Sequence, residues 1–414
     1  MVKYPKDWHI VSLGDYCIIT SSKRVFEKEW TKSGIPFLRT RDIASFHAGE
    51  EQKDKLFISE STYKEKSSVS GEPQQGDLLV TGVGTIGLPF LIDTDDRVYF
   101  KDGNILWIKR SESFYPKWLF LMFLSKDIKE QIAESSGFTT VGTFTIKNAK
   151  KMQLPMPEKT EQKTIAETLT VFDTHIANLT ELIEKKKAIR EGALEDLISG
   201  KNRLDGFEDK WETCSLEAMC YLITKQTGFD YTETIKDSLV LSKKGDVIPF
   251  IQNKDFEGTS VNLHTDYYIP KSVALSFPQI LLDEKCLLIS ISGKIGNVGV
   301  YDNPELAFIG GAICIARLKD KDYTEWVMRF LQSSIGQYEL TKSEKTSSHH
   351  NLTIKDVRKV IIPIPSKPEA YAINSILADM DTEIASLEEE RDKMIKIREG
   401  AMDDLLTGKV RLTD

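Results

Sequence analysis

The stretch IREGALEDLISGKNRL (189–204) returns near the end of the chain as IREGAMDDLLTGKVRL (397–412). The two copies lie 208 positions apart, and the similarity continues upstream without a gap. Between 144–204 and 352–412, 28 of 61 positions are identical. A repeat of this length predicts that the chain is built from two copies of one structural unit.

The segments before these copies also match, but more weakly. They occur in the same order in both halves, with shifts of different size, so insertions are confined to them. The matching pairs are DWHIVSLGDYC (7–17) with KWETCSLEAMC (210–220), GIPFLRTRDI (34–43) with VIPFIQNKDF (247–256), and DLLVTGVGTIG (77–87) with CLLISISGKIG (286–296). Each unit is therefore a variable globular segment followed by a nearly fixed one.

The fixed segment is predicted to be a long helix. After Pro157 there is no proline until the second globular segment, and Gly200 and Gly408 are placed to end the two helices. Apolar residues recur in steps of three and four, which is the seam of a coiled coil. The seam residues are Ile165, Leu169, Phe172, Ile176, Leu179 and Ile183 in the first copy, and Ile373, Leu377, Met380, Ile384 and Leu387 in the second.

The variable segments are predicted to be mixed α/β, or α+β, with short strands. Strands are expected at IPFLRTRDI, DLLVTGVGTIG, LPFLID and NILWIK, with counterparts at IPFIQNKDF, CLLISIS, VGVYD and AICIARL. Helices are expected over 115–132 and 323–335. The predicted organisation is a globular domain over 1–153, a helix over 154–204, a second globular domain over 205–361 and a helix over 362–414.

Composition sets limits on the class of protein. With 414 residues, 40% hydrophobic and 29% charged, the chain can form two or three folded domains. The longest apolar run, Trp118–Leu124, is far shorter than a membrane span, and no secretory signal is visible. The five cysteines are scattered without a CxxC motif, so neither a zinc ribbon nor a disulfide framework is predicted. We therefore expect a cytoplasmic protein.

The net charge of −8 argues, taken alone, against nucleic-acid binding. The charge is uneven, however. Residues 1–150 hold 21 basic and 20 acidic residues, whereas 361–414 hold 7 and 12. A balanced globular domain can still present a basic face.

Two helices with apolar seams bury them at least cost against each other. If the two units are related by a pseudo-twofold axis, the helices run antiparallel and hold two globular heads at a set separation. Such an arrangement suits a rigid, periodic target such as duplex DNA, on which paired modules read two half-sites. Because the heads differ in sequence, the half-sites are expected to differ.

With this order of motifs, the chain resembles the specificity subunit of a bacterial type I restriction–modification enzyme. The resemblance rests on PKDWHIVSLGD (5–15) and its second copy, IPFLRTRDI, DLLVTGVGTIG, TIKNAKKMQLPMP (145–157) and the doubled IREGA helix end. It covers essentially the whole chain. It implies two target recognition domains joined by antiparallel coiled-coil helices, which read a bipartite, asymmetric sequence in double-stranded DNA.

The resemblance also implies partners. The helices would dock two modification subunits, which carry S-adenosylmethionine-dependent adenine-N6 methylation. Restriction subunits that use ATP and Mg would join in some systems. The chain itself would bind no cofactor or metal and would catalyse no reaction.

Candidate DNA-contacting residues lie in matched polar segments of the two heads, where side chains can reach phosphates or base edges. The trio after each IPF strand is expected to alternate between the faces of a sheet. An ordinary solvated surface is the alternative for each position. The candidates are Ser22, Lys23, Arg24, Arg39, Thr40, Arg41, Thr139, Thr140 and Thr143 in the first half, and Lys225, Gln226, Lys243, Lys244, Gln252, Asn253, Lys254, Ser347, Ser348, His349, His350 and Asn351 in the second.

Three further patterns favour ordinary readings. Gly82–Gly87 matches GxGxxG but opens no helix, so a turn between strands is predicted rather than a cofactor loop. The pair His349 and His350 has no partners at ligand spacing, so no metal site is predicted. The usual interpretation of Lys185–Lys187 is a solvated face balanced by Glu181, Glu184 and Glu191. The alternative hypothesis is that Glu388–Glu390, in the matching region of the second helix, favour pairing of unlike helices by opposite charge.

Two other functions stay open on the sequence alone. A coiled-coil adaptor whose heads bind proteins explains the repeat equally well and the acidity better. A self-contained restriction enzyme is disfavoured, because the chain shows no NPPY-like methylation motif and no nuclease motif.

Overall fold

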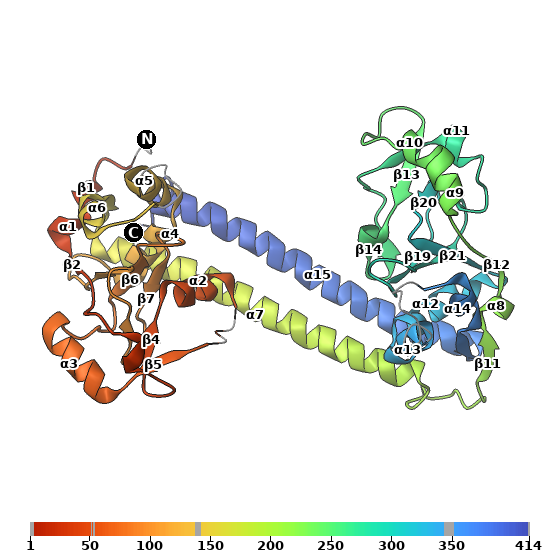
Figure 1. Ribbon diagram of the computed structural model, residues 1–414, viewed down its shortest axis with the longest axis horizontal. Coiled ribbons are helices and arrows are strands. Elements are labelled where there is room, and N and C mark those ends of the chain that lie inside the picture. Colours follow the sequence, from red (N-terminus) through yellow and green to blue (C-terminus); the bar gives the residue numbers. More distant parts are fainter. Residues whose placement is uncertain (1–3, 51, 53, 137–141, 343–351, 413–414) are drawn as a thin grey trace. The chain divides into compact units, whose positions relative to one another are not determined.

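A computed structural model describes residues 4–50, 52, 54–136, 142–342 and 352–412. The chain divides into two compact units, one formed by 1–180 with 389–414 and the other by 181–388. The first unit holds the first globular head, the N-terminal part of the first long helix and the C-terminal part of the second. The second unit holds the second globular head and the remaining part of each long helix (Figure 1). Below, the first head is the part of the first unit before helix α7 (Lys159–Ile198), and the second head is the part of the second unit between α7 and α15 (Lys367–Leu406).

In the described part of the first head, the strands form two four-stranded sheets and one strand pair. One sheet has the order β2-β9-β6-β7 and the other β3-β5-β4-β8, while β1 pairs with β10 just before α7. All pairs are antiparallel except β4 with β8. The strands are β1 (His9–Ser12), β2 (Ile19–Thr20), β3 (Trp30–Thr31), β4 (Ile35–Leu38), β5 (Leu56–Ile58), β6 (Leu78–Thr81), β7 (Pro89–Leu91), β8 (Tyr99–Phe100), β9 (Ile105–Ile108) and β10 (Gln153–Met156).

Among its described residues, the first head also has six α-helices and one 3-10 turn. Helix α4 packs against β7, as Figure 1 shows. The helices are α1 (Leu13–Tyr16), α2 (Thr40–Ala48), α3 (Glu60–Ser70), α4 (Pro116–Leu124), α5 (Lys126–Ser136) and α6 (Ile146–Lys151), with η1 at Glu27–Glu29.

The second head repeats most of this plan and has one more strand pair, β14 with β15. Its sheets have the orders β12-β21-β18-β19 and β16-β13-β20-β17, β11 pairs with β22 before α15, and β13 with β20 is again the parallel pair. The strands are β11 (Glu212–Ser215), β12 (Cys220–Lys225), β13 (Val247–Ile251), β14 (Phe256–Glu257), β15 (Ser260–Val261), β16 (Tyr268–Pro270), β17 (Leu281–Leu282), β18 (Cys286–Ser290), β19 (Val298–Tyr301), β20 (Ala307–Ile309), β21 (Ile313–Leu318) and β22 (Ile361–Ile364). The internal repeat and the mixed α/β class are thereby confirmed.

The helical segments of the second head are mostly short. They are α8 (Leu216–Met219), α9 (Gly228–Asp230), η2 (Tyr231–Ile235), α10 (Lys236–Ser238), η3 (Asn253–Asp255), α11 (Lys271–Ala274), η4 (Lys321–Tyr323), α12 (Thr324–Gln332), α13 (Ser334–Thr341) and α14 (Ile354–Lys359).

The long helices α7 and α15 have 40 residues each. Gly200 and Gly408 follow them with φ of 68° and 71°, the left-handed conformation that ends a helix. The two glycines also meet matching aromatic partners. A Cβ on Gly200 would lie 3.2 Å from Trp211, and one on Gly408 would lie 3.2 Å from Trp8. The helix end is therefore fitted against the opening motif of a head.

Within each unit the helix segments run antiparallel. In the first unit Asp173 pairs with Arg398, and His175 pairs with Glu390. In the second unit Lys187 pairs with Glu388 and Arg190 with Asp381. In both sets, moving forward along α7 means moving backward along α15, which confirms the predicted antiparallel pairing.

Part of the predicted seam belongs to the cores of the heads. Ile165 and Leu169 are buried with Trp118 of α4 and Leu405 of α15. Ile373 and Leu377 occupy the same role with Trp326 in the second unit. Each helix is thus joined to its own head by burial of apolar surface over its first turns. The remaining seam residues are buried or half-buried: Phe172, Ile176, Leu179, Ile183, Met380, Ile384 and Leu387.

Two predicted helices are broken in the middle. The segment 115–132 divides at Ser125, and 323–335 divides at Ser333. Both serines have extended ψ angles, 154° and 160°, and the hydroxyl of each accepts a main-chain N–H of the following helix. Local capping by serine therefore overrides the continuous apolar pattern.

Candidate nucleic-acid interface

In the first head, the loop after β2 is held at four consecutive residues. Ser21 Oγ donates to the carbonyl of Ile105 at 3.2 Å, and the buried Ser22 Oγ donates to the carbonyl of Phe100 at 2.6 Å. Arg24 pairs with Asp102 at 3.0 Å although its side chain is 68% exposed. These contacts fix the position of the loop and leave the side chains of Lys23 and Arg24 exposed to solvent.

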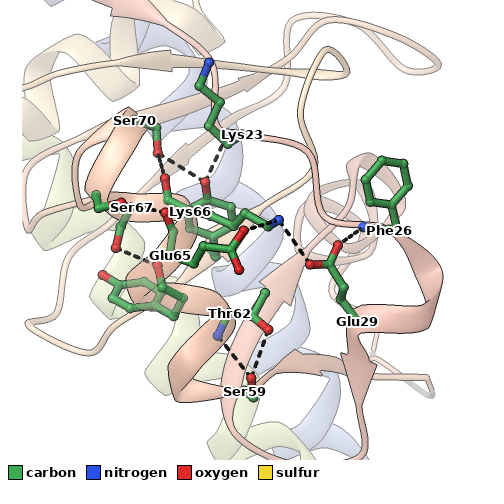
Figure 2. Close-up of polar contacts among 12 residues, drawn as sticks. Lys23, Phe26, Glu29, Ser59, Thr62, Glu65, Lys66, Ser67 and Ser70 are labelled. Carbon is green, nitrogen blue, oxygen red and sulfur yellow. Dashed lines mark hydrogen bonds and ion pairs between the residues drawn. The ribbon is translucent and has the colours of Figure 1, made fainter.

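A tyrosine and helix α3 support the same loop. The hydroxyl of Tyr99 lies 2.9 Å from the main-chain N–H of Lys23 and 3.1 Å from Ser70 Oγ (Figure 2). Of the residues labelled in Figure 2, Lys66 of α3 reaches Glu29, at 3.1 Å. Tyr99 is fully buried, so its hydroxyl fixes the Lys23 backbone from inside the head.

The carboxylate of Glu29 links Lys66 of α3 to the backbone at Phe26. It accepts the main-chain N–H of Phe26 at 2.7 Å, and this hydrogen bond, together with Lys66, lowers the pKa of Glu29. At neutral pH the contact is therefore made by the charged form.

The trio Arg39, Thr40 and Arg41 does not lie on a strand, so the predicted alternation between sheet faces is wrong. Strand β4 ends at Leu38, and Arg39 is the N-cap of α2. Asp42 accepts the main-chain N–H of Arg39 at 2.8 Å and turns the chain into the helix.

The side chains of this trio have unequal freedom. The guanidinium of Arg39 forms a fork on Asp42 at 2.8 Å and also reaches the carbonyl of Asp54. Its hydrogen-bonding capacity is thus largely used within the head. Arg41 is 59% exposed and lies 3.8 Å from Asp54. Of the two arginines, it is therefore the one that a DNA phosphate could attract.

The second head places its trio in the same way. Strand β13 ends at Ile251, Gln252 is the N-cap of a 3-10 turn, and Asp255 accepts the main-chain N–H of Gln252 at 2.7 Å. Lys254 pairs with Asp266, and the Asn253 amide donates to the carbonyl of Ser292. Burial raises the pKa of Asp255, so the cap aspartate is held in a less polar setting than a surface carboxylate.

The remaining candidates divide by exposure. Thr143, Lys225, Lys243 and Lys244 are exposed, and Lys243 lies 3.9 Å from Glu305. Gln226 is 3% exposed. The candidates Thr139, Thr140, Ser347, Ser348, His349, His350 and Asn351 lie outside the described residues.

The GxGxxG segment is a turn, as predicted. Gly84 and Gly87 have φ of 79° and 80°, and the turn joins antiparallel β6 and β7. Thr81 Oγ1 donates to the carbonyl of Thr85 at 2.5 Å and accepts the N–H of Leu88 at 2.9 Å. Ser290 closes the equivalent turn of the second head with Lys294 and Asn297.

Among the described residues, no group of three or more His, Cys, Asp or Glu side chains could hold a metal ion. In the same ranges, no helix has an apolar stretch that could cross a bilayer. Burial raises the pKa of four thiols, that of Cys17 to about 11 and those of Cys220, Cys286 and Cys314 to about 12. Thiols of this kind are protonated at neutral pH and unreactive.

Sequence reasoning missed a buried Trp–Glu–Arg cluster in each unit. In the first, Glu161 accepts from Trp8 Nε1 at 3.1 Å and from Arg411 Nε at 2.6 Å. In the second, Glu369 accepts from Trp211 Nε1 at 2.8 Å and from Arg203 Nε at 2.5 Å. All three residue types are identical in the two copies, which was a usable signal.

Comparison with known proteins gives a consistent result. The family model described as "Type I restriction modification DNA specificity domain" matches residues 5–188 and 208–396. The chain is 23% identical to the type I restriction enzyme MjaVIII specificity subunit of Methanocaldococcus jannaschii, over 99% of this chain and 95% of that protein. It is 24% identical to the EcoBI specificity subunit of Escherichia coli, over 88% of this chain and 77% of that one.

Solved structures share the fold. The crystal structure of a type I S subunit from M. genitalium matches with a TM-score of 0.57 at 14% identity, over 98% of both chains. The HsdS subunit from Thermoanaerobacter tengcongensis matches with a TM-score of 0.51 at 18% identity, over 99% of this chain and 98% of that one.

Proposed function

Because the chain belongs to the family of type I restriction–modification DNA specificity domains, we propose that its two heads read the two halves of a bipartite, asymmetric DNA site. The observation that carries this proposal is that the two heads have equivalent backbone positions with different side chains. The backbone positions that follow β2 and β12, and those that follow β4 and β13, are equivalent in the two heads. The side chains at these positions differ.

The differences are of the kind that changes base preference. Ser22 in the first head corresponds to Gln226 in the second, and Arg39, whose guanidinium is held by Asp42, corresponds to Gln252. Serine can bond to several bases, whereas glutamine pairs with adenine. Equivalent backbone positions with unlike hydrogen-bonding groups support unlike half-sites.

The long helices support the rest of the proposal. A helix of 40 residues extends about 60 Å, which is enough to keep two reading modules apart on a duplex. We propose that α7 and α15 set the spacer and dock two modification subunits. Those partners would bind S-adenosylmethionine and methylate adenine at N6, while ATP and Mg would enter only with restriction subunits. This chain would supply recognition and no reaction.

The net charge of −8 accords with such a division of work. Affinity for DNA is dominated by contacts between cations and phosphates, and in a complex of several subunits other chains can provide them. The chain alone is therefore expected to bind DNA weakly.

The test is methylome sequencing. A host carrying this chain with its modification subunit is compared with a host carrying the modification subunit alone. The proposal predicts a bipartite adenine-methylated motif that requires this chain. A coiled-coil adaptor whose heads bind proteins predicts no motif that depends on it, and that result would remove the proposal.

A further inference from the structure

The side-chain oxygen of a buried amide in the second head has no hydrogen-bond partner among the described residues. Gln226 is 3% exposed, and its Nε2 donates to the carbonyl of Ile309 at 3.4 Å. Its Oε1 is fully buried and accepts no hydrogen bond. A buried acceptor without a donor is costly, so it calls for an explanation.

The orientation of the amide is fixed by its neighbour. The carbonyl of Ile309 can only accept, so the NH₂ end of Gln226 must face it. The atom left over is therefore the acceptor Oε1. A ligand that satisfies it has to bring an N–H or O–H donor.

The side chain lines an open cavity of about 310 Å³. Other residues of the wall are Tyr231, Phe250, Gln252 and Gly311. A Cβ on Gly311 would lie 3.2 Å from Gln226 Oε1, so the lack of a side chain at Gly311 leaves space beside this buried atom. Aromatic walls with a few polar groups are typical of sites for flat, polar molecules.

The first head does not have this free acceptor. Ser22 stands at the equivalent position, three residues after the strand pair Ile19–Ile108, as Gln226 stands three residues after Ile223–Ala316. Its hydroxyl donates to the carbonyl of Phe100, which corresponds to Ile309, at 2.6 Å. The structural bond is thus kept in both heads, and only glutamine adds a second functional group.

We propose that Gln226 is a specificity-determining residue of the second head, and that its cavity receives the amine-bearing edge of adenine or cytosine. These two bases present an exocyclic NH₂ donor, whereas guanine and thymine present acceptors at the equivalent groove positions. The inference rests on the proposed DNA-reading function. It adds that one position of the half-site read by this head carries an amine.

The experiment uses the full chain in complex with its modification subunit and a duplex carrying the methylated motif. Each adenine in the second half-site is replaced in turn by purine, and each cytosine by 2-pyrimidinone, which removes the exocyclic amine alone. The wild-type complex should lose on the order of 10-fold in affinity or more at one position. The Gln226→Ser complex should show no further loss at that position and wild-type losses elsewhere.

Gln226→Ser copies the residue of the first head, so the bond to Ile309 can be kept. Gly311→Ala is the second variant; it fills the space beside Oε1 without removing this atom and should abolish the same amine dependence. Ser272→Ala, at an exposed position of α11 in the second head, is the control and should leave it unchanged. If both Gln226→Ser and Gly311→Ala keep the full wild-type amine dependence at every position, the inference is wrong.

Two outcomes separate this inference from the proposed function. If the wild-type complex shows no sequence-specific binding, both fail. If it reads a bipartite site but the variants leave amine dependence intact, only this inference fails. Adenosine and cytidine are titrated as well, because saturable binding of the free nucleosides without any DNA amine dependence would assign the cavity to a small molecule instead.

Discussion

Arg398 Nε lies 2.9 Å from Asp173 Oδ1, and its counterpart Arg190 Nε lies 2.9 Å from Asp381 Oδ1. Each bond joins the helix of one copy to the helix of the other, inside one unit. The same residue types at the same distance therefore join the two helix segments within each unit, as expected for two copies of one structural unit. The two ion pairs differ in one neighbour, which leads to a prediction.

Asp381→Asn should destabilise the protein much more than Asp173→Asn. Arg329, buried to 5% side-chain exposure, lies 2.6 Å from Asp381 and would lose its anion, at a cost of about 3 kcal/mol. Asp173 is 41% exposed, so its loss should cost only about 0.5 kcal/mol. Urea unfolding of each unit measures both values.

The first copy suggests the rescue for this change. Leu121 stands where the second copy has Arg329, and it is fully buried. Arg329→Leu combined with Asp381→Asn should regain the part of the stability that is lost through Arg329, because only Arg190 is then left without its anion, as Arg398 is in Asp173→Asn. Equal destabilisation by the two single Asp→Asn variants would contradict the role given to Arg329.

The Trp–Glu–Arg clusters should be essential to the junction between helix and head. Glu369 is 0% exposed, so Glu369→Gln leaves Arg203 without its buried anion and should cost about 3 kcal/mol. Glu161→Gln should act similarly in the first unit. The exposed Glu212→Gln is the control, and a calorimetric melt that ranks it with the other two would refute this assignment.

Opposite charges should favour pairing of unlike helices. Lys186 lies 2.7 Å from Glu383, and Lys187 lies 2.8 Å from Glu388. Reversing both lysines to glutamate should cost about 1–2 kcal/mol at low salt, because attraction becomes repulsion. Adding Glu383→Lys and Glu388→Lys should restore stability, and a double-mutant cycle without coupling energy would show that these charges are neutral to pairing.

Thiol labelling should distinguish one cysteine from the other four. Burial raises the pKa of Cys17 to about 11 and those of Cys220, Cys286 and Cys314 to about 12, so at pH 8 these groups stay protonated and react slowly. Cys214 is the partly exposed one. Maleimide mass labelling at pH 8 should modify Cys214 first and all five only in denaturant; early labelling of Cys286 would contradict the packing of β18.

Patterns that depend on long periodicity were predictable from the sequence. The seam from Ile165 to Ile183 and the stop at Gly200 were enough to place a 40-residue helix, and the repeat was enough to pair two of them antiparallel. The turn at Gly82–Gly87 followed from the absence of a helix after it.

Features that depend on single side chains were not predictable. Arg39 was expected on a strand. In the structure it is the N-cap of α2, and Asp42, three residues later, completes the capping box that starts the helix. The support of Lys23 by Tyr99 joins residues 76 positions apart, which no local pattern reports. The positions of the DNA-reading candidates therefore came from the structure, while their approximate segments came from the repeat.

The central claim is that each head reads one half of a divided DNA site. It is tested most directly by replacing residues 1–150 with the equivalent segment of another family member and sequencing the methylome of the host. The account predicts that one half of the methylated motif changes while the other half and the spacer length stay the same. A motif that is unchanged, or altered in both halves, would contradict it.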